Sequence, residues 1–233
     1  MDFVVKPIAI IPARSGSKRI PDKNIIDFDG SPLIASTIQS AIQSECFEHV
    51  IVSTDSEKYA NIAKKLGAEV PFLRNDAYDD YCPVSQATAQ ALQQSEIFFK
   101  QNYEIVVQLM PNCPLRSSNT IQKCIKAFNE FKPHSLISCF KFGWMNPYWA
   151  YKIDGSNNPV PIFPDYTSSR SQDVPKLFCP TGSIWVSDCE RLKINQSFYS
   201  PEWKFFEIPW IEAVDIDTYD DLKMALVLKK SFG

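Results

Sequence analysis

The chain has 233 residues, of which 45% are hydrophobic and 22% are charged, and its formal net charge is −3. These values are ordinary for a soluble globular protein, and the length suits a single α/β domain with a sizeable core. The negative balance argues against a general nucleic-acid binder, so an anionic ligand would have to be bound by a local basic cluster. No apolar run approaches the ~20 residues needed to cross a bilayer, so we expect no membrane association and a cytoplasmic location.

The seven cysteines are odd in number and form no C-x-x-C pair, which argues against a disulfide framework or a zinc site. Free thiols in a reducing compartment fit better, most of them as small core residues. The only two histidines, His49 and His134, each precede an apolar run typical of a strand. A Ser-His-Asp or histidine–metal mechanism therefore has little material in this sequence.

Apolar runs alternate with helix-like stretches along the first half of the chain, which predicts a βαβα order and a largely parallel sheet. Strands are expected at residues 8–11, 50–53 and 68–73. Helices are expected to open at Ser31-Pro32, at Ser56 and near Ser85, and to end near Ile42, Gly67 and Phe99.

The second half continues this pattern with one interruption. Strands are expected at residues 105–107, 136–140, 184–186 and 213–217, and helices at 119–131 and 218–228. Residues 142–180 are rich in proline and aromatic residues without a helical period, so we interpret them as an arm inserted within one domain, 1–233. The aromatic side chains of such an arm need covering, and a partner subunit is the natural cover.

The loop after the first predicted strand carries four cations within ten residues: Arg14, Lys18, Arg19 and Lys23. Open α/β sheets bind ligands outside the carboxyl ends of their strands, and small residues at 15–17 let backbone N–H groups approach phosphate oxygens. The loop is not a Walker A motif, because Pro12 stands where that motif requires glycine. It suits a triphosphate, although a solvated basic loop explains the charge clustering equally well.

Acidic side chains close two later segments. In Asp215-Ile216-Asp217, alternation along a strand would put both carboxylates on one side, where they suit Mg²⁺. The alternative is that Asp217 merely begins the final helix. Asp55 and Arg74 follow further strands at the same sheet edge, where they could touch nucleotide or metal. For Asp55 we favour the alternative, a helix cap.

Six segments, in order along nearly the whole chain, resemble the acylneuraminate cytidylyltransferases, the CMP-sialic acid synthetases. They are residues 10–24, 51–55, 111–116, 170–175, 180–185 and 215–218. The resemblance implies a three-layer, glycosyltransferase-A-like and Rossmann-like α/β fold with a mostly parallel sheet. It also implies a homodimer, in which residues 142–180 form a dimerisation arm over the partner's active site. The implied substrates are CTP and a nine-carbon 2-keto-3-deoxy sugar acid, and the implied metal is Mg²⁺, with Mn²⁺ as an alternative.

The resemblance also implies roles for individual residues. The catalytic residues would be Arg14, Lys23 and Asp217, and the metal ligands Asp215 and Asp217. The nucleotide would be bound by Ala13, Arg14, Ser15, Gly16, Ser17, Lys18, Lys23, Asn24 and Arg74. The sugar would be bound by Met110, Asn112, Arg116, Tyr148, Arg170 and Gln172.

Several departures from the family pattern concern the sugar. Met110 stands where the sialic acid enzymes carry glutamine, Ser171 replaces an arginine, and Tyr148 stands near an expected lysine. These changes favour a less polar sugar, such as a legionaminic or pseudaminic acid. Two alternatives stay open: a cytidylyltransferase for another sugar acid such as Kdo, and a non-catalytic nucleotide-binding module. The presence of Lys23, Asp215 and Asp217 argues against the second.

Overall fold

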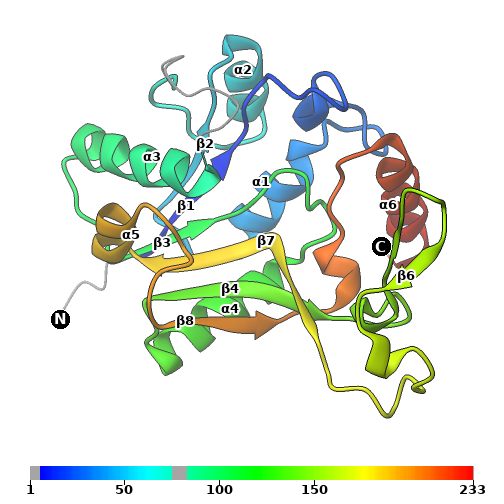
Figure 1. Cartoon of the computed structure of the whole chain (residues 1–233). Coiled ribbons are helices and arrows are strands. Elements are labelled where there is room, and N and C mark those ends of the chain that lie inside the picture. Colours follow the sequence, from blue (N-terminus) through cyan, green and yellow to red (C-terminus); the bar gives the residue numbers. More distant parts are fainter. Residues whose placement is uncertain (1–5, 75–82, 233) are drawn as a thin grey trace.

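A computed structural model describes residues 6–74 and 83–232, which form a six-stranded sheet between layers of helices (Figure 1). The strand order is β2-β1-β3-β7-β4-β8. The strands are β1 (Ile8–Pro12), β2 (His49–Ser53), β3 (Ile105–Gln108), β4 (Ser135–Lys141), β7 (Phe178–Asp188) and β8 (Trp203–Glu207). Only β7 runs antiparallel to its neighbours among these pairs, so the expected mostly parallel sheet is confirmed.

Helices cover both faces of the sheet. They are α1 (Ile34–Gln43), α2 (Glu57–Lys65), α3 (Val84–Phe99), α4 (Ser118–Phe131), α5 (Cys189–Asn195) and α6 (Tyr219–Phe232). In β1, Ala9 and Ile11 pack into a core with α1, α2 and α4, whereas Ile8 and Ile10 pack into a core with α3 and α5. Successive side chains of a strand point to opposite faces, so this fully buried strand divides its residues between two cores.

A third, smaller core lies between α6 and the segment that follows β1. Ile20, Phe28 and Leu33 from that segment pack against Ile216 and Leu222. Ile20 and Ile216 have no exposed surface. Burial of these two side chains in one cluster brings the start and the end of the chain together at the carboxyl edge of β1.

Several boundaries differ from the sequence predictions. The first helix begins at Ile34, not at Ser31-Pro32, because Pro32 pairs with Asp27 in a β-bridge. The predicted strand at 68–73 is reduced to one bridge, between Glu69 and Ile51. The predicted strand at 213–217 is absent: a 3-10 turn, η4 (Trp210–Ala213), precedes an irregular segment. Helix α5 and strand β8 were not predicted.

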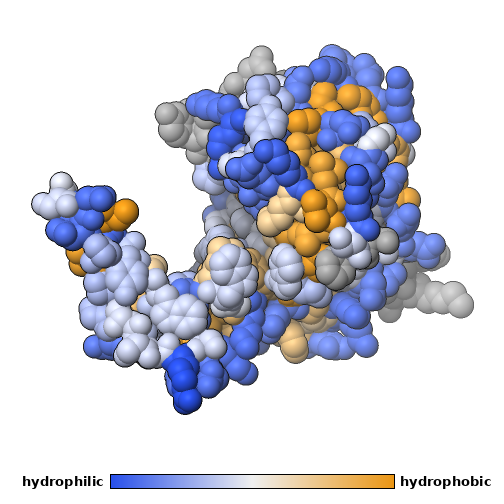
Figure 2. Space-filling model, turned by 90° about the vertical axis from the view of Figure 1, so that its right-hand side faces the viewer, coloured by the Kyte–Doolittle hydropathy of each residue, from blue (hydrophilic) through white to orange (hydrophobic). Residues whose placement is uncertain are grey.

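The predicted arm leaves the sheet after β4 and returns at β7. It contains a separate hairpin of β5 (Tyr151–Ile153) and β6 (Pro159–Pro161) and two 3-10 turns, η2 (Pro147–Trp149) and η3 (Pro164–Tyr166). The first residues of β7 fall within 142–180 but continue the main sheet against β4. Figure 2 shows the arm standing away from the body of the molecule. Among the described helices, none has the length and apolarity required to span a membrane.

Candidate functional site

The segment from Ala13 to Asn24, called the basic loop below, leaves the sheet at the end of β1. The N–H of Ala13 donates to the Ser53 carbonyl at 2.9 Å, so the pairing of β1 with β2 extends one residue into the loop. Inside the loop, the Ser17 N–H donates to the Ser15 carbonyl at 3.0 Å, and Asn24 Nδ2 donates to the Arg14 carbonyl at 3.0 Å. These bonds give the loop a defined path back towards Lys23, which begins the 3-10 turn η1 (Lys23–Ile25).

Asp55 contacts the basic loop instead of capping a helix, so our interpretation of it was wrong. Its Oδ1 accepts the Ser15 N–H at 2.9 Å and its Oδ2 accepts the Ser15 hydroxyl at 3.1 Å. Ser56 caps α2, since its Oγ accepts the Tyr59 N–H. The N–H groups of Ser15 and Ser17, which we expected to face phosphate, are therefore used within the protein.

The acidic pair is oriented by the residue between its members. Because Ile216 is fully buried in the third core, Asp215 and Asp217 point the other way, although no strand forms there. The N–H groups of Asp217 and Thr218 both donate to Asp221 Oδ2, at 3.0 and 2.7 Å. Asp217 thus also takes part in the start of α6, as the alternative interpretation required.

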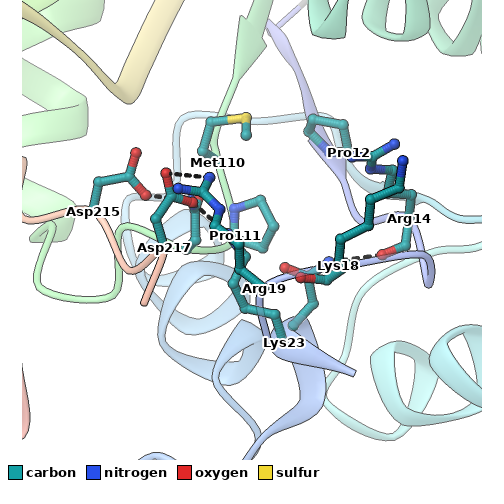
Figure 3. Close-up of a pocket in the computed structure, with 12 residues that line it drawn as sticks. Pro12, Arg14, Lys18, Arg19, Lys23, Met110, Pro111, Asp215 and Asp217 are labelled. Carbon is teal, nitrogen blue, oxygen red and sulfur yellow. Dashed lines mark hydrogen bonds and ion pairs between the residues drawn. The ribbon is translucent and has the colours of Figure 1, made fainter. Parts of the chain in front are cut away.

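The basic loop and the acidic pair meet directly (Figure 3). Lys23 Nζ donates to Asp217 Oδ1 at 2.8 Å and to the Ile216 carbonyl at 2.9 Å. Arg19 Nη2 lies 2.7 Å from Asp217 Oδ2. Both oxygens of Asp217 therefore hold a cation from a segment almost two hundred residues away. Beside them, the Asn112 side-chain amide donates to Asp215.

These groups line one cavity of about 600 Å³. Its wall is formed by Pro12, Arg14, Ser17, Lys18, Arg19, Lys23, Asn24, Met110, Pro111, Asn112, Asp215 and Asp217. In Figure 3 the Met110 side chain lies between Asp215 on one side and Pro12 on the other. Ala13, Ser15, Gly16 and Arg74 are absent from this wall. Arg19 and Pro111 belong to it although no role was assigned to them, and the only sequence signal for Arg19 was its place among the loop cations.

The two aspartates of the pair differ in proton affinity. Burial, with added repulsion from Asp217, raises the pKa of Asp215 to about 6, and Lys23 opposes this shift. Burial also acts to raise the pKa of Asp217, but Lys23 and Arg19 together hold it below its usual value. Near neutral pH, Asp217 is therefore an anion paired with two cations. Asp215 is the member of the pair that is protonated more readily.

The donor set fits a cation that brings further ligands with it. No group of three or more His, Cys, Asp or Glu side chains in residues 6–74 and 83–232 is arranged to hold a metal ion. Two carboxylates are enough for Mg²⁺, which keeps waters and phosphate oxygens as its remaining ligands. Asp215 and Asp217 suit a metal that is shared with a bound triphosphate.

The residues assigned to the sugar fall into three places. Met110 and Asn112 lie on the cavity wall. Arg116 lies behind it: it is 3% exposed, and its Nη1 donates to the Ser183 carbonyl at 2.5 Å. Burial lowers the pKa of Arg116 to about 10. In this chain its guanidinium joins the 110–116 segment to β7, and it does not reach the cavity.

The other three sugar candidates lie in the arm, away from this cavity. Tyr148 packs against the ring of Tyr166, with centroids 4.2 Å apart. Arg170 is exposed and pairs with Asp173 at 2.6 Å. Gln172 lines a separate hollow of about 640 Å³ within the arm. Within one chain, the residues assigned to the sugar are therefore not brought together.

Comparisons with known proteins show which family and which fold this chain resembles. Residues 8–151 match the family model described as cytidylyltransferase. The chain is 34% identical to a pseudaminic acid cytidylyltransferase of Campylobacter jejuni over 97% of both proteins. It is 35% identical to a CMP-N,N'-diacetyllegionaminic acid synthase of Legionella pneumophila over 91% of this chain and 90% of that protein. A solved CMP:2-keto-3-deoxy-manno-octonic acid synthetase, complexed with CTP, has a similar fold, with a TM-score of 0.72 at 16% identity and coverage of 97% and 99%.

Proposed function

The chain belongs to the cytidylyltransferase family, and on this premise we propose that it joins CTP to a nine-carbon 2-keto-3-deoxy sugar acid, a nonulosonic acid. The products are a CMP-sugar and pyrophosphate. The observation that carries the proposal is the meeting of four loop cations with an acidic pair at one cavity. A triphosphate needs such cations, and a phosphate-bound metal needs such carboxylates.

The reaction requires little covalent chemistry from the protein. The anomeric hydroxyl of the sugar attacks the α-phosphorus in line, the bond to the β-phosphate oxygen breaks, and pyrophosphate leaves. Arg14, Lys18 and Lys23 line the cavity, and in this proposal they hold the triphosphate and balance the charge that develops on the leaving group. Asp215 and Asp217 would hold Mg²⁺ or Mn²⁺, which supplies polarisation of the phosphoryl oxygens and a lower pKa for the attacking hydroxyl.

The substrate is tested by pyrophosphate release. The purified protein is incubated with each of the four nucleoside triphosphates and a panel of sialic, legionaminic, pseudaminic and Kdo acids. We expect release only with CTP and a nine-carbon acid. Release with Kdo alone would identify the eight-carbon alternative, and CTP binding without release from any acid would identify a non-catalytic nucleotide-binding module.

Within the nonulosonic acids, we propose a less polar member, such as pseudaminic or legionaminic acid. Met110 presents a thioether to the cavity where a polar side chain would bind hydroxyls. Gly182 supports this arrangement, because a Cβ at that position would lie 2.9 Å from Met110 Cγ. A larger residue at 182 would force Met110 to move, so the position of the thioether depends on this glycine.

For the complete site we propose a homodimer in which the arm contributes to the partner's cavity. The arm exposes large aromatic and aliphatic side chains, with Trp144 83% and Ile153 72% exposed. Large exposed side chains of this kind are often covered by a protein partner. A dimeric mass by light scattering at micromolar concentration is the expected result, and a monomeric mass would contradict it.

We place this reaction in the cytoplasm. The six cysteines of the described residues are all free thiols, and four of them are buried. Such thiols suit a reducing compartment.

A further inference from the structure

The junction between β2 and α2 supports the basic loop at a point where sheet pairing stops. The last backbone hydrogen bond between the basic loop and β2 is donated by the Ala13 N–H to the Ser53 carbonyl, at 2.9 Å. Two residues further along both segments, the Asp55 carboxylate accepts the N–H and the hydroxyl of Ser15, at 2.9 and 3.1 Å. The Asp55 side chain thus takes over where the backbone hydrogen bonds between β1 and β2 stop. It holds the first turn of the loop at Ser15.

Asp55 is itself held firmly. Thr54, just before it, is fully buried, and its carbonyl accepts the Arg74 N–H at 2.8 Å. The Thr54 hydroxyl accepts the Ser56 N–H at 3.2 Å, and Ser56 caps α2. The backbone on both sides of Asp55 is therefore anchored to the body, as a residue that orients a functional loop requires.

The charge of Asp55 points to a geometric role. A carboxylate beside a loop that binds a polyanion is unfavourable for electrostatic attraction. Asp55 does not line the cavity, and both its oxygens are directed at Ser15. Ser15 in turn accepts the Ser17 N–H through its carbonyl, and Ser17 lies on the cavity wall. The contact at Asp55 is therefore transmitted to the wall through one turn of the chain.

We propose that Asp55 is a positioning residue for CTP: it holds the Ser15–Ser17 turn in the shape that directs the basic loop towards the triphosphate. This inference rests on the proposed function. Without the contact, the loop cations are still present but no longer held in one arrangement. A misplacement of about 1 Å can cost a large factor in binding or rate.

Two substitutions at the same position separate geometry from charge. Asp55→Ala removes both acceptors, and we expect the KM for CTP to rise about tenfold and kcat to fall as well, because the same cations balance the charge on the leaving group. Asp55→Asn keeps an oxygen for the Ser15 N–H, and its amide can donate to the Ser15 hydroxyl. It should restore the KM to within about twofold of the parent. If Asp55→Asn is as damaging as Asp55→Ala, or if Asp55→Ala leaves the KM unchanged, the proposal is overturned.

Glu57→Ala is the matched control, because Glu57 is an exposed acid in the first turn of α2. It should leave both constants unchanged. Amide hydrogen exchange of the peptide 13–24 supplies a readout that needs no substrate. Faster exchange in Asp55→Ala alone supports the proposal, and equal exchange in the parent and both variants contradicts it. Failure of the proposed function would show instead as a parent protein that releases no pyrophosphate.

Discussion

One end of the cavity, where the basic loop meets Asp215 and Asp217, is called the phosphate end below because we propose that the triphosphate binds there. This end and the arm are opposite kinds of structure. At the phosphate end, Lys23 is only 14% exposed in its side chain and bonds to Asp217 across 194 positions of sequence. Ile20 and Ile216, each next to charged residues of the site, are fully buried in the same core. In the arm, by contrast, Tyr151, Ile153 and Val160 of the hairpin are exposed, and the two strands pair only with each other. Figure 2 shows this separation of arm and body.

The difference shows that one chain brings together most of the residues assigned to CTP but not those assigned to the sugar. Lys23, Arg19 and Asp217, which we propose to serve the triphosphate and its metal, are held by ion pairs within the body. The arm residues assigned to the sugar, Tyr148, Arg170 and Gln172, lie outside that cavity. The comparison therefore predicts separable effects: substitutions in the body should act on CTP and on turnover, and substitutions in the arm should act on the sugar.

The largest effect is expected for Asp217→Ala. It removes the carboxylate that binds Lys23 and Arg19 and that we propose as a metal ligand. We expect kcat to fall about a thousandfold or more in a pyrophosphate-release assay, because charge stabilisation is the main source of the rate. CTP binding without metal should survive in part, since the loop cations remain.

Asp220→Ala is the control for this change. Asp220 is 91% exposed and pairs with Lys223 on the surface of α6, three residues from Asp217. It should retain the parental kcat. A parental rate in Asp217→Ala would remove the metal assignment and with it the contrast between the two regions.

The sequence predicted the core of the fold because the core is encoded locally. Strands β1 and β3 appear as short apolar runs, and α2 is marked by its capping residue, Ser56. Strand β8 was not predicted because it lies at the edge of the sheet. Lys204 and Phe205 are both exposed there, so the sequence shows no alternation of buried and exposed residues. Helix α5, with seven residues, is too short for a periodic pattern.

The site was predictable in its components but not in its contacts. The cations of the loop and the acidic pair are visible in the sequence, and the resemblance to a family joined them. Asp55 was misassigned because Asp55 and Ser56 are both good helix caps by residue type, and only the position of Ser15 in space decides between them. The burial of Arg116 behind the cavity could not be predicted, because it depends on how β7 packs.

A substitution in the arm tests the comparison from its other side. Tyr148→Ala removes a ring that packs on Tyr166 and Phe163 near the base of the hairpin. If the arm serves the sugar, the KM for the nonulosonic acid should rise about tenfold, while the KM for CTP stays within about twofold. Phe98→Ala, at an exposed aromatic of α3 outside the arm, is the control. Equal changes in both KM values would show that arm and body do not act separately.

The smallest effect is expected for Arg19→Gln, which sharpens the comparison within the body. Arg19 and Lys23 bind the same carboxylate, but the Arg19 side chain is 64% exposed and that of Lys23 is 14% exposed. Water screens an exposed pair, so its loss costs about 1 kcal/mol or less. We therefore expect the KM for CTP to rise by about fivefold at most.

The same variant should change metal binding in the opposite direction. In the free protein, Arg19 and Lys23 occupy both oxygens of Asp217, so a divalent cation arriving alone has to compete with them. Removing Arg19 takes one positive charge away from the acidic pair and frees one oxygen of Asp217, so the affinity of the nucleotide-free protein for Mn²⁺, measured by calorimetry, should increase. Lys58→Gln is a matched control, because Lys58 is 62% exposed and pairs with Asp22 outside the cavity. A decrease in Mn²⁺ affinity in Arg19→Gln would mean that Arg19 supports the metal site instead of competing for Asp217, and the phosphate end would then depend on its exposed cation as much as on its buried one.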